Sequence, residues 1–421
     1  MKQRVFNTIL IAALALNLYI GTRSYLNSAQ TKTGEDVFVQ MEKFTRVMEE
    51  VRRHYVDPDK VAYGDLVENA LQGMITQLDP HSEYMNAKRH EDLRSDTRQQ
   101  FGGIGVIISI RNDWLTVIEP MEDGPGAKAG LRSGDQIVKI EDASTEGFTS
   151  QDAVDLLRGK PGTDVTVTIR RGEQKNQSIT LTREIIKTKS VRDLNGRGEY
   201  KLLEEQFGYA RINSFSERTA DELEDALTSM EEAGMKALVL DLRDNPGGLL
   251  TQSARVAEKF LKRGELVVFT EGRKQREQDR LVALGANPRT MPLVVLINEN
   301  SASASEIVAG CLQDHKRAEL VGAKSFGKGS VQTILPLRDG SAIRLTTAKY
   351  FTPTRRTIHE KGIKPDHAVD MTAEQYRDVQ IKRQPGGYED LPEEEQKRID
   401  AAEDLQLKKA LEVLRSKLAD Q

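Results

Sequence analysis

The stretch "PLVVLINENSASASEIVAG", residues 292–310, places a short apolar run directly before three serines that alternate with alanines. The apolar run is typical of a strand that is covered on both faces, and a helix is predicted from about Ser303. The run "ALVLDL", residues 237–242, has the same character. Buried strands that alternate with helices predict α/β organisation for this part of the chain.

Working outward, the length of 421 residues indicates two or three domains. Helical spacing of apolar residues dominates before residue 98, short β-rich runs separated by Gly, Pro and Asp follow, and the composition becomes strongly charged after Asp370. We therefore predict a signal or anchor segment over residues 1–30, an N-terminal helical region over 34–97, a small β-rich domain over 98–186, an α/β core over 187–371 and a charged C-terminal helical region over 372–421.

Two amphipathic helices are predicted near the ends of the chain. Apolar residues from Phe38 to Val51 recur at three- and four-residue spacing. Five leucines between Leu405 and Leu418 predict a closing helix that serves as an oligomer contact. Within the core, Thr219 and Glu222 predict a capping box, and so do Thr149 and Asp152 in the β-rich domain; these two pairs are each spaced as Ser/Thr-x-x-acid.

The composition excludes several function classes. The formal charge of −4 argues against broad nucleic-acid binding, which needs a basic surface. A single cysteine, Cys311, rules out an intramolecular disulfide and cysteine-rich zinc motifs. The six histidines form no HExxH pair. We expect neither a metal nor another cofactor.

The N-terminus predicts export. Lys2 and Arg4 precede a mostly apolar run over residues 5–21, the pattern of a positive n-region and an apolar h-region. The best cleavage candidate, Asn27-Ser28-Ala29, fits poorly, and we favour an uncleaved anchor over a cleaved signal. The positive residues then stay in the cytoplasm, and the rest of the chain lies in the periplasm or cell envelope, anchored to the inner membrane.

The serines of residues 298–310 lie where α/β proteins bind ligands, at the carboxyl edge of the sheet. A serine at a helix N-terminus is placed to attack a carbonyl, because the following N–H groups receive the oxyanion. Ser303 and Glu306 are also spaced as a capping box, and on this segment alone a structural cap is favoured. Spacing does not choose among Ser301, Ser303 and Ser305.

The stretch "VGAKSFGKGSVQ", residues 321–332, places Lys328 between two glycines. It satisfies G-x4-G-K, but Gly329 occupies the position where a phosphate loop needs Ser or Thr, and the residues that follow look extended. A phosphate-loop ATPase is therefore disfavoured.

A lysine can instead act as a general base. Its pKa, ordinarily about 10.4, must then fall through burial, and flanking glycines allow close delivery of the amine. If residues 328–332 form one strand, Lys328 and Gln332 share a face and the Gln332 amide orients the amine without adding charge. Taken singly, a solvated turn lysine and a surface glutamine are the favoured interpretations.

Two glycine-containing stretches have features of binding loops. "DLRDNPGG", residues 241–248, ends a buried strand, and its glycines let backbone N–H groups approach a substrate oxygen; a plain strand-to-helix turn is the alternative. Gly103-Ile104-Gly105-Val106 opens the small domain, where successive free N–H groups before an exposed strand can hold a peptide carboxylate. On its own that pattern is more often a turn or bulge.

The sequence resembles the carboxyl-terminal processing peptidases, also called tail-specific proteases. Seven stretches carry the resemblance in family order over about residues 78–366: "LDPHSEYM", "FGGIGV", "GAKAGLRSGDQI", "DLRDNPGG", "NENSASASEIVAG", "SFGKGSVQ" and "LTTAKYFTPTRRTIHEKGIKPD". The resemblance implies a PDZ domain inserted between the N-terminal helices and an α/β serine protease core with crotonase/ClpP-like αββ elements.

Residue by residue, the resemblance implies specific roles. The nucleophile falls on Ser303, the base on Lys328 and its orienting partner on Gln332. The oxyanion hole would use the amide of Ala304 and one from Gly247 or Gly248. The peptide-binding loop of the PDZ domain falls on Gly103, Ile104, Gly105 and Val106.

The family cleaves proteins near free, apolar C-termini, and in some members the PDZ domain gates the active site. Two alternatives remain. One is a non-catalytic peptide-binding scaffold with the same PDZ groove. The other, a chymotrypsin-like PDZ protease, would need a GDSGG or GNSGG loop, and neither occurs here.

Overall fold

The computed structural model describes residues 36–420 except 112, 173, 197, 274–276, 384–387, 389 and 390. The predicted signal or anchor segment, residues 1–30, lies outside the described residues. Of the helices that are described, none is long and apolar enough to cross a membrane. The chain divides into two compact units, Met1–Tyr84 and Met85–Gln421.

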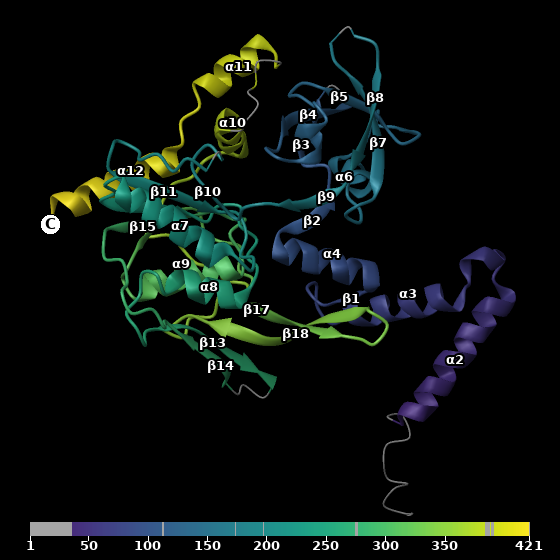
Figure 1. Cartoon of the computed structure of the whole chain (residues 1–421). Helices are drawn as coiled ribbons and strands as arrows, with labels where there is room; N and C mark the ends of the chain where they lie inside the picture. The colour runs from purple at the N-terminus through teal and green to yellow at the C-terminus, as the bar shows by residue number, and fades with distance from the viewer. Residues whose placement is uncertain are drawn as a thin grey trace, which may run out of the picture. The chain divides into compact units, whose positions relative to one another are not determined.

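The first unit contains two helices joined by a short 3-10 turn (Figure 1). They are α2 (Val37–His54), η1 (Pro58–Lys60) and α3 (Tyr63–Thr76), and β1 (Glu83–Met85) follows. Asp36 caps α2 by accepting from the Phe38 N–H at 2.9 Å. The apolar face that the spacing predicts on α2 is exposed: Phe38 is 79% and Met41 54% accessible.

The small β-rich domain follows helix α4 (Ala87–Arg98). Its elements are β2 (Gln100–Gly103), β3 (Val106–Arg111), β4 (Trp114–Pro120), α5 (Pro125–Lys128), β5 (Gln136–Ile140), β6 (Ala143–Ser144), α6 (Ser150–Leu157), β7 (Asp164–Arg170), β8 (Gln177–Thr182) and β9 (Glu184–Lys187). Antiparallel strands run in the order β3-β4-β5-β7-β8, with β6 on β5, and β2 pairs with β9. Alternate residues such as Val165, Val167 and Ile169 point into one buried core.

The core domain is built on a mostly parallel sheet, β10 (Val191–Arg192), β11 (Phe207–Ile212), β12 (Ala237–Asp241), β15 (Leu293–Ile297), β16 (Glu319–Gly322) and β19 (His367–Ala368), in that spatial order. Strand β10 alone among them runs antiparallel to its neighbour. Every residue of β12 and β15 is buried, as the apolar runs predict. The α/β organisation is thus confirmed for this region.

Three helices follow strands of this sheet: α7 (Thr219–Glu232) after β11, α8 (Leu250–Ala257) after β12 and α9 (Ala304–Asp314) after β15. Their apolar side chains form one core cluster with the sheet. A second sheet has β18 (Ala342–Phe351) paired with β17 (Ser330–Pro336) and β13 (Leu266–Gly272), and β13 with β14 (Glu277–Val282). Figure 1 shows β17 and β18 as a long hairpin.

The C-terminal region forms α10 (Ala373–Arg383), α11 (Glu393–Asp400) and α12 (Leu405–Ala419). The predicted leucine-rich closing helix is α12, and its apolar face is buried within the same chain. Leu407 and Leu414 pack into a core cluster with β11, β12 and β15 of the same chain. The prediction of an oligomer contact on this face is therefore wrong, because the sheet of its own chain covers it.

Two of the predicted capping boxes, those at α6 and α7, differ in outcome. At α6, Thr149 and Asp152 form the reciprocal bonds of a capping box. At α7 the residue before the helix is Arg218, and no side chain caps it. The Thr219 hydroxyl instead donates to Ser190, because a buried polar partner is available there. The prediction at Thr219 is wrong for that reason.

Candidate active site

Two strand ends bring the predicted loops together. β12 and β15 are parallel neighbours, with Leu238 opposite Leu293. The loops that follow the two strands therefore begin at the same edge of the sheet. The Ser301 hydroxyl donates to the Leu242 carbonyl at 2.8 Å, and the Asp244 N–H donates to Asn298 Oδ1 at 2.9 Å. The stretches 241–248 and 298–310 therefore form one structural unit.

The three serines differ in what their hydroxyls do. Ser301 and Ser305 are fully buried, and each donates to a carbonyl of the neighbouring loop, Leu242 and Asn245 respectively. Ser303 is partly exposed. It forms the predicted capping box with Glu306, in which its side-chain oxygen accepts and its N–H donates, and no described carbonyl accepts its hydroxyl proton. Of the three candidates that spacing leaves open, Ser303 has the hydroxyl available for chemistry.

Ser303 also has an unusual backbone. Its φ of 55° and ψ of −113° lie far from the extended conformation of an ordinary N-cap residue. A residue other than glycine that is held in such a sparsely populated backbone conformation destabilises the fold by about 1–3 kcal/mol, and it persists only where the surrounding structure enforces it. Such strain clusters at active sites, and here it falls on the residue to which the resemblance assigns the role of nucleophile.

Glu306 joins the serine loop, the part of residues 298–310 that precedes α9, to the lysine loop, the part of residues 321–332 that precedes β17. The sequence identifies Glu306 only as a capping partner. Its Oε2 accepts from the N–H of Ser303 and of Lys328, both at 2.9 Å. Its Oε1 accepts from the Gly327 N–H at 2.8 Å and the Ser325 hydroxyl at 2.6 Å. Three of these partners are backbone N–H groups, which can only donate, and together they favour the ionised carboxylate.

Burial raises the pKa of Glu306 above its ordinary value, and the bonds from Ser325 and from the Ser303, Gly327 and Lys328 amides oppose this shift. The carboxyl group is therefore held in a costly state by four hydrogen bonds. Its location was detectable in the sequence as the residue three after Ser303. Its contact with residues 325–328 was not.

The lysine loop packs directly on the serine loop. The Phe326 N–H donates to the Ser301 carbonyl at 3.0 Å, and Lys328 is partly buried. Gly329 lies against the His359 backbone, so a side chain at position 329 would collide with it. The loop therefore reaches its position only with a glycine after the lysine.

Gln332 lies on β17, but the strand argument that linked it to Lys328 is wrong. β17 begins at Ser330, and a register shift lies between Val331 and Gln332, so the alternation of side chains does not extend back to position 328. In this structure the Gln332 amide donates to the Ser330 hydroxyl at 2.9 Å and to Thr346 at 3.3 Å.

Two of the predicted oxyanion residues, Gly247 and Ala304, lie beside Ser303. Gly247 lies so close that a Cβ there would be 2.7 Å from Ser303 Cβ and 3.0 Å from the Ala304 nitrogen. The Gly247 N–H already donates to Asn245 Oδ1 at 2.9 Å. The N–H groups of Ala304 and Gly248 donate to no group in the described part of the chain. Of the two glycines, Gly248 therefore has the available amide.

A buried network of charged side chains holds residues 241–248 in place. Arg243 is fully buried and bonds Asp241 and, from the C-terminal region, Asp404 and Gln406. Burial alone would raise the pKa of Asp241, but the Arg243 charge outweighs it and holds this pKa below its usual range. The C-terminal region, which lies outside the stretches that carry the resemblance, thus helps to position residues 241–248.

The predicted peptide-binding residues form the turn between β2 and β3. Gly103 ends β2, Ile104 is 2% exposed, Gly105 has φ 64° and Val106 begins β3. The carbonyls of Ile104 and Gly105 accept from Gly126 and Met121, whereas their own N–H groups donate to no described residue. β3 lies at the end of its sheet, with β4 on one side only.

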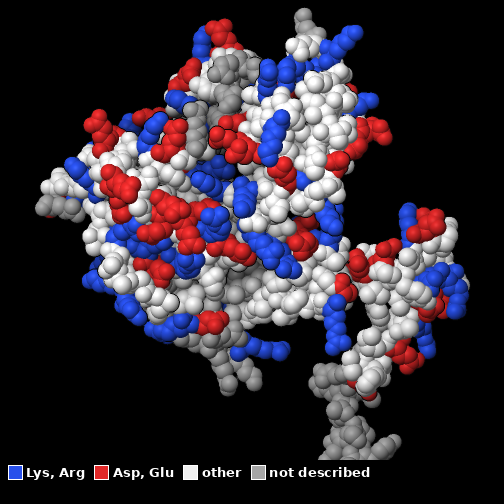
Figure 2. All heavy atoms as spheres, viewed as in Figure 1, with Lys and Arg blue, Asp and Glu red and all other residues white. Residues whose placement is uncertain are grey.

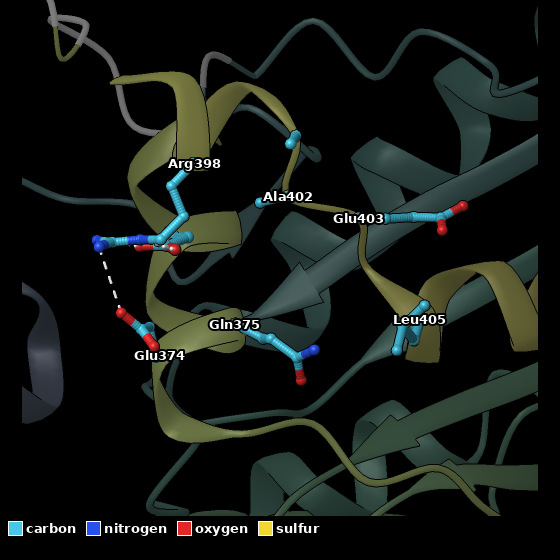
Figure 3. Close-up of a pocket in the computed structure, with 8 residues that line it drawn as sticks. Glu374, Gln375, Arg398, Ala402, Glu403 and Leu405 are labelled. Atoms are coloured by element: carbon cyan, nitrogen blue, oxygen red, sulfur yellow. Dashed lines mark hydrogen bonds and ion pairs between the residues drawn. The ribbon is translucent and has the colours of Figure 1, made fainter. Parts of the chain in front are cut away.

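The C-terminal helices line a pocket. A pocket of about 330 Å³ lies between α10, α11 and the start of α12, where Arg398 pairs with Glu374 and with Asp378 (Figure 3). It holds none of the predicted site residues. Among the described residues no group of three or more His, Cys, Asp or Glu is placed to hold a metal. Acidic and basic side chains are interspersed on the face in Figure 2.

Three known protein-family models match parts of the chain. The fold and site define a serine peptidase with a PDZ domain: the model of peptidase family S41 matches residues 206–369, and that of the PDZ domain matches 116–171. The model of the activating protease CtpB N-terminal domain matches residues 16–89.

The chain is similar to two carboxy-terminal processing proteases and to one solved structure. A carboxy-terminal-processing protease of Bartonella bacilliformis is 44% identical over 351 residues, 82% of this chain and 78% of the relative. The carboxy-terminal processing protease CtpA of Bacillus subtilis is 35% identical over 376 residues, 87% of this chain and 77% of the relative. The solved photosystem II D1 C-terminal processing protease is 30% identical with a TM-score of 0.45, covering 78% of this chain and 92% of that one. The chain belongs to the carboxy-terminal processing proteases of family S41.

Proposed function

We propose that this serine peptidase cleaves exported proteins near free, apolar C-termini, with Ser303 as nucleophile and Lys328 as general base. The observation that carries the proposal is the Glu306 carboxylate, whose single oxygen Oε2 accepts from the backbone of both Ser303 and Lys328 at 2.9 Å. A bridge of this kind supports a shared reaction centre, because it fixes the two residues relative to one another.

In the proposed reaction the neutral Lys328 amine takes the proton from the Ser303 hydroxyl as Oγ attacks the peptide carbonyl. The protonated amine then donates this proton to the leaving amine as the peptide bond breaks. In the second half, the neutral lysine takes a proton from water, the water oxygen attacks the acyl carbon, and the proton returns to Ser303 Oγ as the acyl group is released. Gln332 is proposed to orient the amine during turnover. In the resting arrangement its amide bonds Ser330 and Thr346, so this role requires that the side chain moves.

The developing oxyanion is proposed to lie between the N–H groups of Ala304 and Gly248. Both amides lack an acceptor in the described structure, and Ala304 is the first residue of α9, where the helix dipole adds positive potential. Each such donor contributes about 2.7–4 kcal/mol to the lowering of a barrier of this type. Gly247, whose amide is bonded to Asn245, provides space rather than a hydrogen bond.

Tail recognition is proposed for the PDZ domain. The substrate carboxylate would bind the amides of the Gly103–Val106 turn, and the chain would add to the open edge of β3. The unpaired amides of Ile104 and Gly105, and the place of β3 at the end of its sheet, support this arrangement.

The cellular setting is part of the proposal. We infer a periplasmic or cell-envelope enzyme held to the inner membrane by residues 1–30, on the charge and apolar pattern of that segment. Self-association is proposed through the exposed apolar face of α2, since its Phe38 and Met41 are largely accessible. For the core, we keep the crotonase/ClpP-like arrangement as a proposal.

The function is tested by incubating the purified protein with a disordered test protein that ends in a free apolar carboxyl terminus, and with the same protein carrying a polar, amidated end. Mass mapping should find products of the first substrate only, and Ser303→Ala should abolish them. Binding of the tail without cleavage by the wild type would favour the non-catalytic scaffold and contradict the proposal.

A further inference from the structure

Tyr350 has a buried hydroxyl without a hydrogen-bond partner in the described structure. The residue lies on β18 and is only 2% exposed. An unpaired buried hydroxyl destabilises a folded protein, and native structures retain few of them. A group kept at such a cost calls for an explanation other than stability.

The phenol lies beside the reaction centre. Burial raises the pKa of Tyr350 well above its ordinary value, the charge of Glu306 raises it further, and the nearby Ser303 hydroxyl opposes the shift. The Ser303 side chain is thus close enough to interact with the phenol, although the Tyr350 hydroxyl makes no settled hydrogen bond in the described structure. Because it keeps its proton at working pH, it is a permanent donor.

The backbone of Tyr350 is fixed to the lysine loop. Its N–H donates to the Gly329 carbonyl at 3.0 Å, and the preceding residue, Lys349, pairs with Ser330. Gly329 follows Lys328 directly. Tyr350 thus has its side chain near the nucleophile, and its main chain holds the segment that carries the base.

We propose that the Tyr350 hydroxyl donates a hydrogen bond to Ser303 Oγ in the steps in which that oxygen carries negative charge. The inference rests on the proposed function of Ser303 and Lys328. Two steps are concerned: the Oγ–H proton passes to the Lys328 amine as the Oγ–carbon bond forms, and later this bond breaks and its electron pair returns to Oγ, which recovers a proton from the lysine. Tyr350 keeps its own proton throughout and acts as a catalytic residue.

The test compares Tyr350→Phe with the wild type in kcat, KM and Tm for one tail peptide. Loss of a hydrogen bond to a charged oxygen predicts a kcat about 10- to 100-fold lower, with KM within about twofold. Tm should stay the same or rise, because the variant removes an unpaired hydroxyl. Tyr200→Phe is the matched control: its hydroxyl donates to the Val191 carbonyl at 3.1 Å, so its loss should lower Tm and leave kcat unchanged.

Ser303→Ala in the same assay separates the two levels of the argument. If wild type cleaves, Ser303→Ala does not, and Tyr350→Phe keeps its kcat within about threefold, the Tyr350 role is overturned while the proposed function stands. The same conclusion follows if kcat and Tm of Tyr350→Phe fall together. An inactive wild type, or an active Ser303→Ala variant, overturns the proposed function and this inference with it.

Discussion

Substitution of Glu306 tests how the two loops of the site are held together. In Glu306→Gln one side-chain oxygen becomes an NH₂ group, which cannot accept. If the amide oxygen keeps the Oε2 position, the bonds from Ser303 and Lys328 survive. The NH₂ group then faces the Ser325 hydroxyl, which can turn and accept, and the Gly327 N–H, which is left unpaired.

The magnitude follows from that count. One buried N–H without a partner costs about 1–3 kcal/mol, whereas the opposite amide orientation would strand two. If this cost falls on the active conformation, kcat/KM of Glu306→Gln drops about 5- to 150-fold. Glu306→Ala leaves the amides of Ser303, Gly327 and Lys328 without an acceptor, at a cost of about 3–9 kcal/mol, and should lower kcat/KM by at least about 150-fold.

The assay is kcat/KM for a fluorogenic tail peptide, with the free energy of unfolding from urea titration in parallel. Glu299→Gln is the matched control, because Glu299 is exposed in the loop before the same helix and should give wild-type values. The reasoning fails if Glu306→Ala retains kcat/KM within threefold of wild type, or if the Gln variant is more damaging than the Ala variant.

Three further outcomes are expected. Gly247→Ala should abolish peptide hydrolysis because its methyl group would lie 2.7 Å from Ser303 Cβ, while Gly264→Ala, with φ 88° but open space, should show only the strain in its Tm; equal activities would contradict the packing argument. Asp404→Asn should lose about 3–5 kcal/mol of stability at pH 7, whereas exposed Glu403→Gln should lose little. Burial alone would raise the pKa of Asp404, but the Arg243 charge lowers it. The stability that the carboxylate contributes is therefore present above about pH 3.9 and is lost as the pH falls through the pKa of the folded state. The free energy of unfolding that Asp404→Asn loses relative to wild type should accordingly be smaller at pH 3 than at pH 7. Finally, a tail peptide with a C-terminal amide should have a higher KM than the free acid, and identical KM values would argue against capture of the carboxylate by the PDZ turn.

Local patterns in the sequence predicted the frame of the site well. Two six-residue apolar runs located β12 and β15, and because these strands are parallel neighbours, their following loops had to meet. The capping pair at Thr149 and Asp152 located the start of α6. Each of these features depends on residues that are close in the chain, where periodicity and capping chemistry carry the information.

Contacts between distant segments were not predictable in the same way. Nothing in the spacing of three serines distinguishes Ser303; the distinction arises because Leu242 and Asn245, some 60 residues earlier, engage the other two. Arg243 and Asp404 are 161 positions apart, so their pairing shows only in the folded chain. The bulge after Val331 likewise interrupts a strand pattern that looks continuous in one dimension.

The most direct test of the Ser303–Lys328 pair is the site and rate of labelling by a serine-reactive fluorophosphonate, followed by intact mass and peptide mapping of the full chain. A single adduct on Ser303 is expected, absent in Ser303→Ala and slowed at least about 100-fold in Lys328→Ala, in keeping with the loss of a general base. An adduct on Ser301 or Ser305, or an unchanged rate without the lysine amine, would contradict the mechanism.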